Sequence, residues 1–501
     1  MASILRRTAR GASWVVAWRM ATRLLGLVST LILVRLLLPG DFGLIALAAA
    51  FAATLDVCLS LGVEDQIVRA ENPTRQLYDT AFTINLLRAA LAALLVAIAA
   101  GPAGEFFGDP RLEAVLLALA LSALLSGLLN IGTVDFRREL RFEREFAMQI
   151  VPRILGIVVT VGIALWLRSY WALIGGIFVN RIGGIAMSYA LHPFRPRLSL
   201  ACWRDLAGIS AWSWALSVAS IIRDRSESIA IGRVLGPTAM GYYTAGAEVA
   251  VLASTELVDP IGRACMPGFA ASRREGSDGG GGDYLRILGL LSLLTLPAGV
   301  GISLVAGPVV ALGFGQAWLA AVPVIVVLGI ASAATPLASL SSAMLSAHAR
   351  LSQLLAVTLV SATLRIALLF MLTPRLGLTG ATIAVGLSLV TEQLILVLLA
   401  FRLLRLRLAR LAAVLWRPVL AAIAMAVLLR ESGRGWAPAP SDAWIAAQRL
   451  AESVALGVVG YGLSLFLLWS LAGRPASAEA DLLGLVGRLL RARPGRHLPV
   501  A

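Results

Sequence analysis

Runs of about 20 apolar residues recur along the whole chain, and no other feature restricts its fold as strongly. A helix of about 20 apolar residues crosses the roughly 30 Å hydrocarbon core of a bilayer. Hydrophobic residues make up 59% of the 501 residues and charged residues 14%, whereas soluble domains are about 45–50% apolar and about 25% charged. The sequence therefore predicts an all-α polytopic membrane protein. The fourteen expected transmembrane helices cover residues 14–38, 42–63, 79–101, 112–134, 147–167, 171–191, 207–234, 241–262, 285–306, 320–342, 353–372, 378–401, 415–430 and 451–472.

Arginine is distributed unevenly between alternate loops, and this bias predicts the topology. The loop at 137–144 contains four arginines, whereas the next loop contains only Arg168. Short loops rich in basic residues remain on the cytoplasmic side. We therefore expect an even number of spans, with both termini in the cytoplasm.

Two stretches share one frame of residues at an offset of 198. Trp14, Arg35, Pro39 and Gly43 are matched by Trp212, Arg233, Pro237 and Gly241. The pair Gly101-Pro102 recurs as Gly307-Pro308, and we expect both pairs in turns. Leu- and Ala-rich helices also match by chance, but the ordered Trp, Arg, Pro and Gly matches favour a parallel repeat of two six-helix lobes, an arrangement that transporters use around a central site. The expected division is an N-terminal lobe at 1–191, a cytoplasmic connector at 192–206, a C-terminal lobe at 207–410, an extra helix pair at 411–473 and a basic tail at 474–501.

Several arginines fall inside the expected helices, where charge is costly unless it faces a wet cavity or a partner. Arg19 and Arg23 share one face of the first helix because they are four residues apart, and Arg223 and Arg225 lie on the helix that leads the second lobe. Guanidinium groups bind phosphate bidentately, so these arginines predict a central cavity for an anion such as a diphosphate. The expected substrate-binding residues are Arg19, Arg23, Arg88, Arg223, Arg225 and Arg365. Snorkelling of Arg19 and Arg23, and ion pairing of the others with nearby carboxylates, are the alternatives.

Carboxylates inside the expected helices are candidates for coupling transport to protons or cations. Asp56, Glu248 and Glu392 are the expected coupling residues. Pro39, Gly43, Pro237 and Gly241 are expected to form structural turns, and Arg35 and Arg233 to anchor helix ends at the membrane interface.

Composition also excludes several functions. The chain has no lysine, so it contains neither a Walker A lysine nor a Schiff-base lysine. Its three cysteines and three histidines are far apart, and we expect no metal site, no cofactor and no disulfide framework. The basic charge lies in short loops, which favours a topology signal over nucleic-acid binding. Without a catalytic constellation, we expect a protein that is not an enzyme. The tail at 480–496 reads as a basic amphipathic helix for the inner leaflet, or simply as a further topology signal.

The segment Arg35-Leu36-Leu37-Leu38-Pro39-Gly40-Asp41-Phe42-Gly43 resembles the first-loop motif of the polysaccharide and O-antigen flippases, which belong to the multidrug/oligosaccharidyl-lipid/polysaccharide exporter superfamily. The segment from Ile229 to Tyr243 looks like its second-half counterpart. The resemblance covers about residues 5–410. One departure is that the usual aspartate of the seventh helix stands within Arg223-Asp224-Arg225-Ser226-Glu227, so the family's coupling residues transfer poorly.

The resemblance implies a flippase that moves polyprenyl-diphosphate-linked oligosaccharide units across the inner membrane for lipopolysaccharide, capsule or exopolysaccharide biosynthesis. A polysaccharide polymerase and glycosyltransferases are the further expected partners, beside membrane lipid. Two alternatives remain: a cation-coupled multidrug exporter of the same superfamily, and a non-transporting scaffold of a polysaccharide assembly complex. The sequence names neither the sugar nor the coupling ion.

Overall fold

The structure is a computed structural model that describes residues 21–22, 25–26, 28–59, 62–139, 141–206, 211–274, 281–475, 478–480 and 482. These residues form helices joined by short connections, with no strand among them, as the sequence predicted. Contacts divide the chain into two compact units, which we call unit 1 (Met1–Thr244) and unit 2 (Ala245–Ala501). The five expected domains follow the sequence repeat instead of these contacts, and they remain a prediction.

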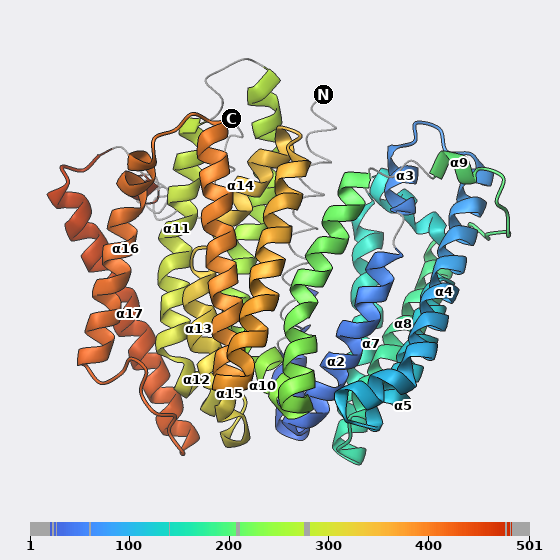
Figure 1. Cartoon of the computed structure of the whole chain (residues 1–501), viewed down its shortest axis with the longest axis horizontal. Helices are drawn as coiled ribbons and strands as arrows, with labels where there is room; N and C mark the ends of the chain where they lie inside the picture. The colour runs from blue at the N-terminus through green and yellow to red at the C-terminus, as the bar shows by residue number, and fades with distance from the viewer. Residues whose placement is uncertain are drawn as a thin grey trace, which may run out of the picture. The chain divides into compact units, whose positions relative to one another are not determined.

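Unit 1 consists of long apolar helices with short helices at their ends (Figure 1). Residues 28–36 are helical and lead into the first of them. Local signals set the ends of these helices: Pro39 starts α2, the Thr74 side chain caps α4, and Gly108 with φ 69° ends α4. The elements are α2 (Pro39–Cys58), α3 (Val63–Arg69), α4 (Arg75–Phe107), α5 (Arg111–Ser126), the 3-10 helix η1 (Ile131–Val134), α6 (Asp135–Arg138), α7 (Phe142–Leu167), α8 (Trp171–Leu191), α9 (Trp203–Leu206) and the first part of α10 (Ala211–Arg274).

The two matched motifs of the sequence pack directly against each other within unit 1. A Cβ added at Gly43 would overlap the carbonyl oxygen of Pro237, and a Cβ added at Gly241 would overlap the carbonyl oxygen of Pro39. The contacts are reciprocal, so the 198-residue repeat corresponds to a local two-fold arrangement. Gly236, with φ 81° and ψ 179°, breaks α10 immediately before Pro237 and lets the chain turn at this point. The turn role predicted for these four residues is thus consistent with their geometry.

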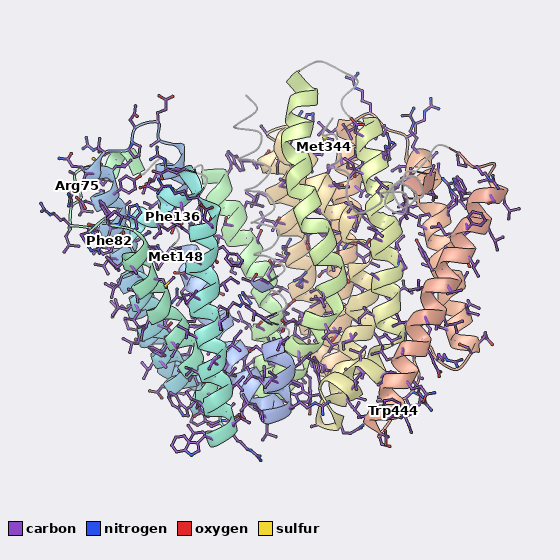
Figure 2. The ribbon with its side chains drawn as sticks, turned by 180° about the vertical axis from the view of Figure 1, so that it is seen from behind. Arg75, Phe82, Phe136, Met148, Met344 and Trp444 are labelled. Atoms are coloured by element: carbon purple, nitrogen blue, oxygen red, sulfur yellow. The ribbon has the colours of Figure 1, made fainter. Side chains whose placement is uncertain are left out.

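Unit 2 contains the remaining helices, with the C-terminal pair packed on α11 and α12. Tyr284, Leu288, Met344 and Phe401 form one buried core, and Leu304, Met425 and Tyr461 belong to another. Met344 and Trp444 lie toward opposite ends of this unit (Figure 2). Trp444 is 78% exposed, as expected of a tryptophan at a membrane interface. The elements are the second part of α10, α11 (Gly281–Leu304), α12 (Ala306–Gly313), η2 (Gln316–Ala321), α13 (Val322–Ser332), α14 (Thr335–Ala347), α15 (Leu351–Leu403), α16 (Leu408–Glu431) and α17 (Ala443–Leu471).

The described residues contain eight helices that are long and apolar enough to span a membrane, or up to ten if each of two bent pairs is one span. The protein is therefore a multi-pass membrane protein. One of the eight, α15, is two helices joined at Gly377, whose φ is 59° and ψ −139°. The predicted number of fourteen stays a prediction, because residues 14–20, 23–24 and 27 of the expected first helix lie outside the described residues.

Four local features differ from those expected from the sequence. The expected helix at 112–134 bends by 71° between Ser126 and Ile131, and the one at 320–342 bends by 47° near residue 333. The expected loop at 263–284 is mostly helical, because α10 continues to Arg274 and α11 begins at Gly281. Pro102 lies inside α4 instead of in a turn. Proline is tolerated in membrane helices where neighbouring groups satisfy the freed carbonyl.

Candidate functional site

Unit 1 encloses a polar cavity among its membrane helices. It consists of a larger part of about 620 Å³ and a smaller part of about 300 Å³, which adjoin because both are lined by Glu64, Thr133 and Arg181. Such volumes are typical of small-molecule sites, which occupy about 300–1,000 Å³. The charged lining residues are Asp56, Glu64 and Arg88 of α2 to α4, Arg137 of α6, Glu145 and Arg153 of α7, and Arg181 of α8.

Asp56 and Arg88, both predicted from the sequence, form an ion pair in the larger part. The Arg88 guanidinium donates to the Asp56 carboxylate and, at 3.4 Å, to the Asp56 backbone carbonyl. The Arg88 side chain is only 19% exposed, whereas that of Asp56 is 50% exposed to the cavity. This pair joins α2 to α4 and neutralises both charges.

Arg137 lies between two further carboxylates and balances the charge of one of them. Its Nε lies 2.9 Å from Glu145 Oε1, and its Nη1 lies 3.5 Å from Glu64 Oε2. The sequence predicted Arg137 in a cytoplasmic loop. It lies in α6, and the bend between α5 and α6 directs this segment beside the cavity, while its predicted side of the membrane stays a prediction.

Arg153 and Arg181 differ from these arginines. Within the described part of the chain, neither makes an ion pair, although the Asp56 carboxylate exerts an electrostatic attraction on Arg181. Their helices pack closely: a Cβ at Gly183 would lie 3.2 Å from the Pro152 ring, and one at Gly156 would lie 3.1 Å from Asn180. Both arginines are exposed to the cavity that they line. The arrangement therefore offers two guanidinium groups, from neighbouring helices, to an anion.

A cluster of polar side chains lies beside this cavity, at the end of unit 1 where α4 begins, near Arg75, Phe82 and Phe136 (Figure 2). Tyr78 donates to Asp135, whose other carboxylate oxygen lies 3.4 Å from His192 Nε2. Burial lowers the pKa of His192 below its ordinary value of 6.5, against the opposing attraction of Asp135. The fully buried Asn130 accepts from Gly132 N at 3.0 Å and donates to the Phe194 carbonyl at 2.8 Å. These bonds fix Thr133 and Val134, which line both parts of the cavity.

Of the other predicted residues that the structure describes, none lines this cavity. Arg19 and Arg23 lie outside the described residues. Arg223 donates from Nε to Asp224 at 2.8 Å, which is the alternative pairing that the sequence left open. Arg225 lines a small, largely apolar pocket with Leu47 and Phe107, and its buried Nε has no hydrogen-bond partner among the described residues.

In unit 2, Arg365 is 5% exposed and donates to Ser388 at 2.8 Å, while Glu392 accepts from Ser361 at 2.9 Å. Each of these two hydrogen bonds joins the two halves of α15. Glu248, on α10 in unit 2, is half-buried. The roles predicted for these residues as substrate or coupling ligands stay predictions.

Only Asp56 and Arg88 of the charged lining residues were predicted as site residues. Arg153 falls inside the expected helix at 147–167 next to Pro152, and the rule that intramembrane charge marks function would have found it. Arg181 falls inside the expected helix at 171–191, and the same rule applies to it. The sequence did not predict Glu64, Arg137 and Glu145 as site residues either. Among the described residues, no cluster of His, Cys, Asp or Glu is arranged to hold a metal ion.

Comparison with known proteins places this geometry in context. The sequence profile of a family described as polysaccharide biosynthesis protein matches residues 32–323. The succinoglycan biosynthesis transport protein ExoT of Rhizobium meliloti (strain 1021) is 26% identical over 322 residues, which are 63% of this chain and 64% of ExoT. The lipopolysaccharide biosynthesis protein WzxC of Escherichia coli (strain K12) is 22% identical over 64% of this chain and 66% of WzxC. The chain thus spans just under two thirds of the length of these two relatives.

Solved structures share the fold. The lipid II flippase MurJ, in an inward closed conformation, superposes with a TM-score of 0.72 over 92% of this chain and 100% of MurJ, at 12% identity. An inward-facing multidrug resistance MATE family transporter of the MOP superfamily reaches a TM-score of 0.56 over 76% of this chain and 94% of that chain, at 16% identity. At these identities the likeness extends to the fold alone. The matched profile includes more than half of the residues, and the chain therefore belongs to the polysaccharide biosynthesis protein family.

Proposed function

We propose that this protein is a flippase that moves polyprenyl-diphosphate-linked oligosaccharide units across the bacterial inner membrane for cell-surface polysaccharide biosynthesis. It acts by alternating access, with both termini in the cytoplasm, and performs no catalysis. The observation that carries the proposal is a cavity among membrane helices that presents two arginines without ion-pair partners among the described residues, in a chain of the polysaccharide biosynthesis family.

The charge of the cavity supports an anionic ligand. Its lining contains four arginines and three carboxylates. Arg88 is neutralised by Asp56, and Arg137 lies between Glu145 and Glu64. Arg153 and Arg181 remain for the ligand. A diphosphate offers several oxygens to two guanidinium groups, each of which can bind bidentately and stays charged at any physiological pH.

We propose Asp56 as the coupling group on the same grounds. Of the three predicted carboxylates, Asp56 is the one that lines this cavity, where it holds Arg88 and attracts Arg181. Protonation of Asp56 would release Arg88 and remove the attraction on Arg181. A proton at Asp56 would therefore change the affinity of this cavity for the phosphate, which links proton binding to substrate binding.

The test is export of polysaccharide from cells that lack the gene and carry single-copy variants. Charged hydrogen bonds contribute about 1.5–3 kcal/mol each, so Arg153→Gln and Arg181→Gln should each lower transport about tenfold to a hundredfold. Lipid-linked intermediates should build up on the cytoplasmic face. Arg168→Gln is the matched control, because Arg168 is exposed and lies outside both parts of the cavity.

Normal export from a stably inserted Arg153→Gln/Arg181→Gln double variant would reject the site. The same cells test the alternatives. A multidrug exporter predicts altered drug susceptibility with unchanged polysaccharide, and a scaffold predicts lost polymer without accumulated intermediates.

A further inference from the structure

A second cavity, of about 420 Å³, lies in unit 2, between α11, α16 and residues 478–480, which follow α17. It lies toward the end of unit 2 at which α16 begins and α17 ends, away from Trp444, which lies at the start of α17. Its walls are mainly apolar, with Leu285 and Leu293 of α11 and Val414 of α16 among them. Gly289 brings α11 close to its neighbours: a Cβ there would lie 3.1 Å from Val414 and 3.2 Å from Ala478.

Charge is concentrated in one part of this apolar lining. Arg417 is 6% exposed and Glu479 is 5% exposed, and Arg417 Nη1 lies 3.3 Å from Glu479 Oε1. Arg286 of α11 lines the same cavity and is exposed. The charged lining residues that the structure describes are thus two arginines and one carboxylate.

Buried ion pairs are stable when tight packing surrounds them, but here a large volume adjoins the pair. One water occupies about 30 Å³, so water alone would have to fill the cavity with a cluster against apolar walls. An amphipathic ligand fits better, with an anionic end on the arginines and a hydrocarbon chain along the leucines. We propose that this cavity binds the phosphate of a membrane lipid on Arg286 and Arg417, and that Glu479 occupies Arg417 when the lipid is absent.

The phosphate has two lipid sources, a bulk anionic phospholipid and a polyprenyl phosphate, and both share this chemistry. Glu479 competes with either of them, because one carboxylate and one phosphate cannot both take the same face of the Arg417 guanidinium. Loss of the Glu479 charge should therefore strengthen lipid binding, whereas loss of the Arg286 charge should weaken it. A purely structural ion pair predicts the opposite for Glu479: the substitution would destabilise the protein, and lipid would not restore it.

The experiment is a native mass spectrometry titration of the full chain in detergent. The probes are dioleoylphosphatidylglycerol, dioleoylphosphatidylcholine, undecaprenyl phosphate and inorganic phosphate. Arg286→Gln should weaken binding of an anionic lipid about tenfold, and Glu479→Gln should strengthen it about tenfold, each the change expected for one charge contact. Arg410→Gln is the control, because Arg410 is an exposed residue of α16 outside the cavity.

Preference for phosphatidylglycerol over phosphatidylcholine would support the site with bulk phospholipid as its ligand, and stronger retention of undecaprenyl phosphate would support it with a polyprenyl lipid. Equal binding to the wild type, Arg286→Gln and Glu479→Gln would overturn the proposal. Displacement of lipid by equimolar inorganic phosphate would overturn its lipid component. If Glu479→Gln is unstable without lipid, recovery of its thermal stability by phosphatidylglycerol but not by phosphatidylcholine supports the site, and failure to recover rejects it.

Discussion

Substitution of Gly241 by alanine tests whether the two matched turns are a fixed contact of the fold. The new Cβ would overlap the carbonyl oxygen of Pro39 and lie 2.8 Å from its carbonyl carbon and 3.2 Å from Gly43 N. All three are backbone atoms, so no side-chain rotation relieves the overlap. The backbones of the two turns would therefore have to move apart.

The magnitude follows from two opposing effects. Overpacking of this kind costs about 1–3 kcal/mol and sometimes more, while alanine in place of glycine in a helix gains about 1 kcal/mol. Because the overlap is with backbone atoms, the cost lies in the upper part of its range, and we expect a net loss of about 2 kcal/mol for Gly241→Ala. Gly43→Ala should behave alike, because its Cβ would overlap the carbonyl oxygen of Pro237.

The assay compares apparent unfolding temperatures of purified variants in one detergent, since unfolding of such proteins is often irreversible and only relative values are meaningful. Gly162→Ala is the control, because Gly162 lies in α7 with nothing within 4 Å of its Cβ position. It should match or exceed the wild type. If Gly241→Ala unfolds no earlier than Gly162→Ala, the reciprocal contact does not exist in the folded protein.

Two further predictions concern the polar cluster beside the cavity, at the start of α4. Burial depresses the pKa of His192 below 6.5, so between this folded pKa and pH 6.5 the unfolded chain binds more protons than the folded chain. The stability that neutral His192 contributes is therefore fully present above pH 6.5 and is lost as the pH falls toward the folded pKa. His192→Gln should flatten this acid-side decline in unfolding temperature, and an unchanged decline would show that other groups cause it. Asn130→Ala should destabilise the protein by about 1–3 kcal/mol, because it leaves the buried Gly132 N–H without its acceptor; Asn130→Asp retains that acceptor, so equal losses in both variants would show that another bond of Asn130 matters more.

The sequence by itself determined that this chain is an all-α, multi-pass membrane protein of the polysaccharide biosynthesis class. Hydropathy and the Pro39–Gly43 and Pro237–Gly241 motifs are local patterns, so they can be interpreted without knowledge of the tertiary arrangement. For the same reason the sequence showed Asp56 and Arg88 only as two charged residues inside expected membrane helices, and it left their partners open.

The tertiary structure alone decided which charges meet. The bend of 71° between α5 and α6 brings Arg137 beside the cavity, where it contacts Glu145, and close packing of α7 on α8 places Arg153 and Arg181 along one cavity. Arg223 donates to Asp224, its neighbour in sequence, which is the pairing that the sequence left open as an alternative. Hydrophobic periodicity places a residue in a helix, but the partner of its charge depends on helix bends and close contacts between segments that are distant in the sequence.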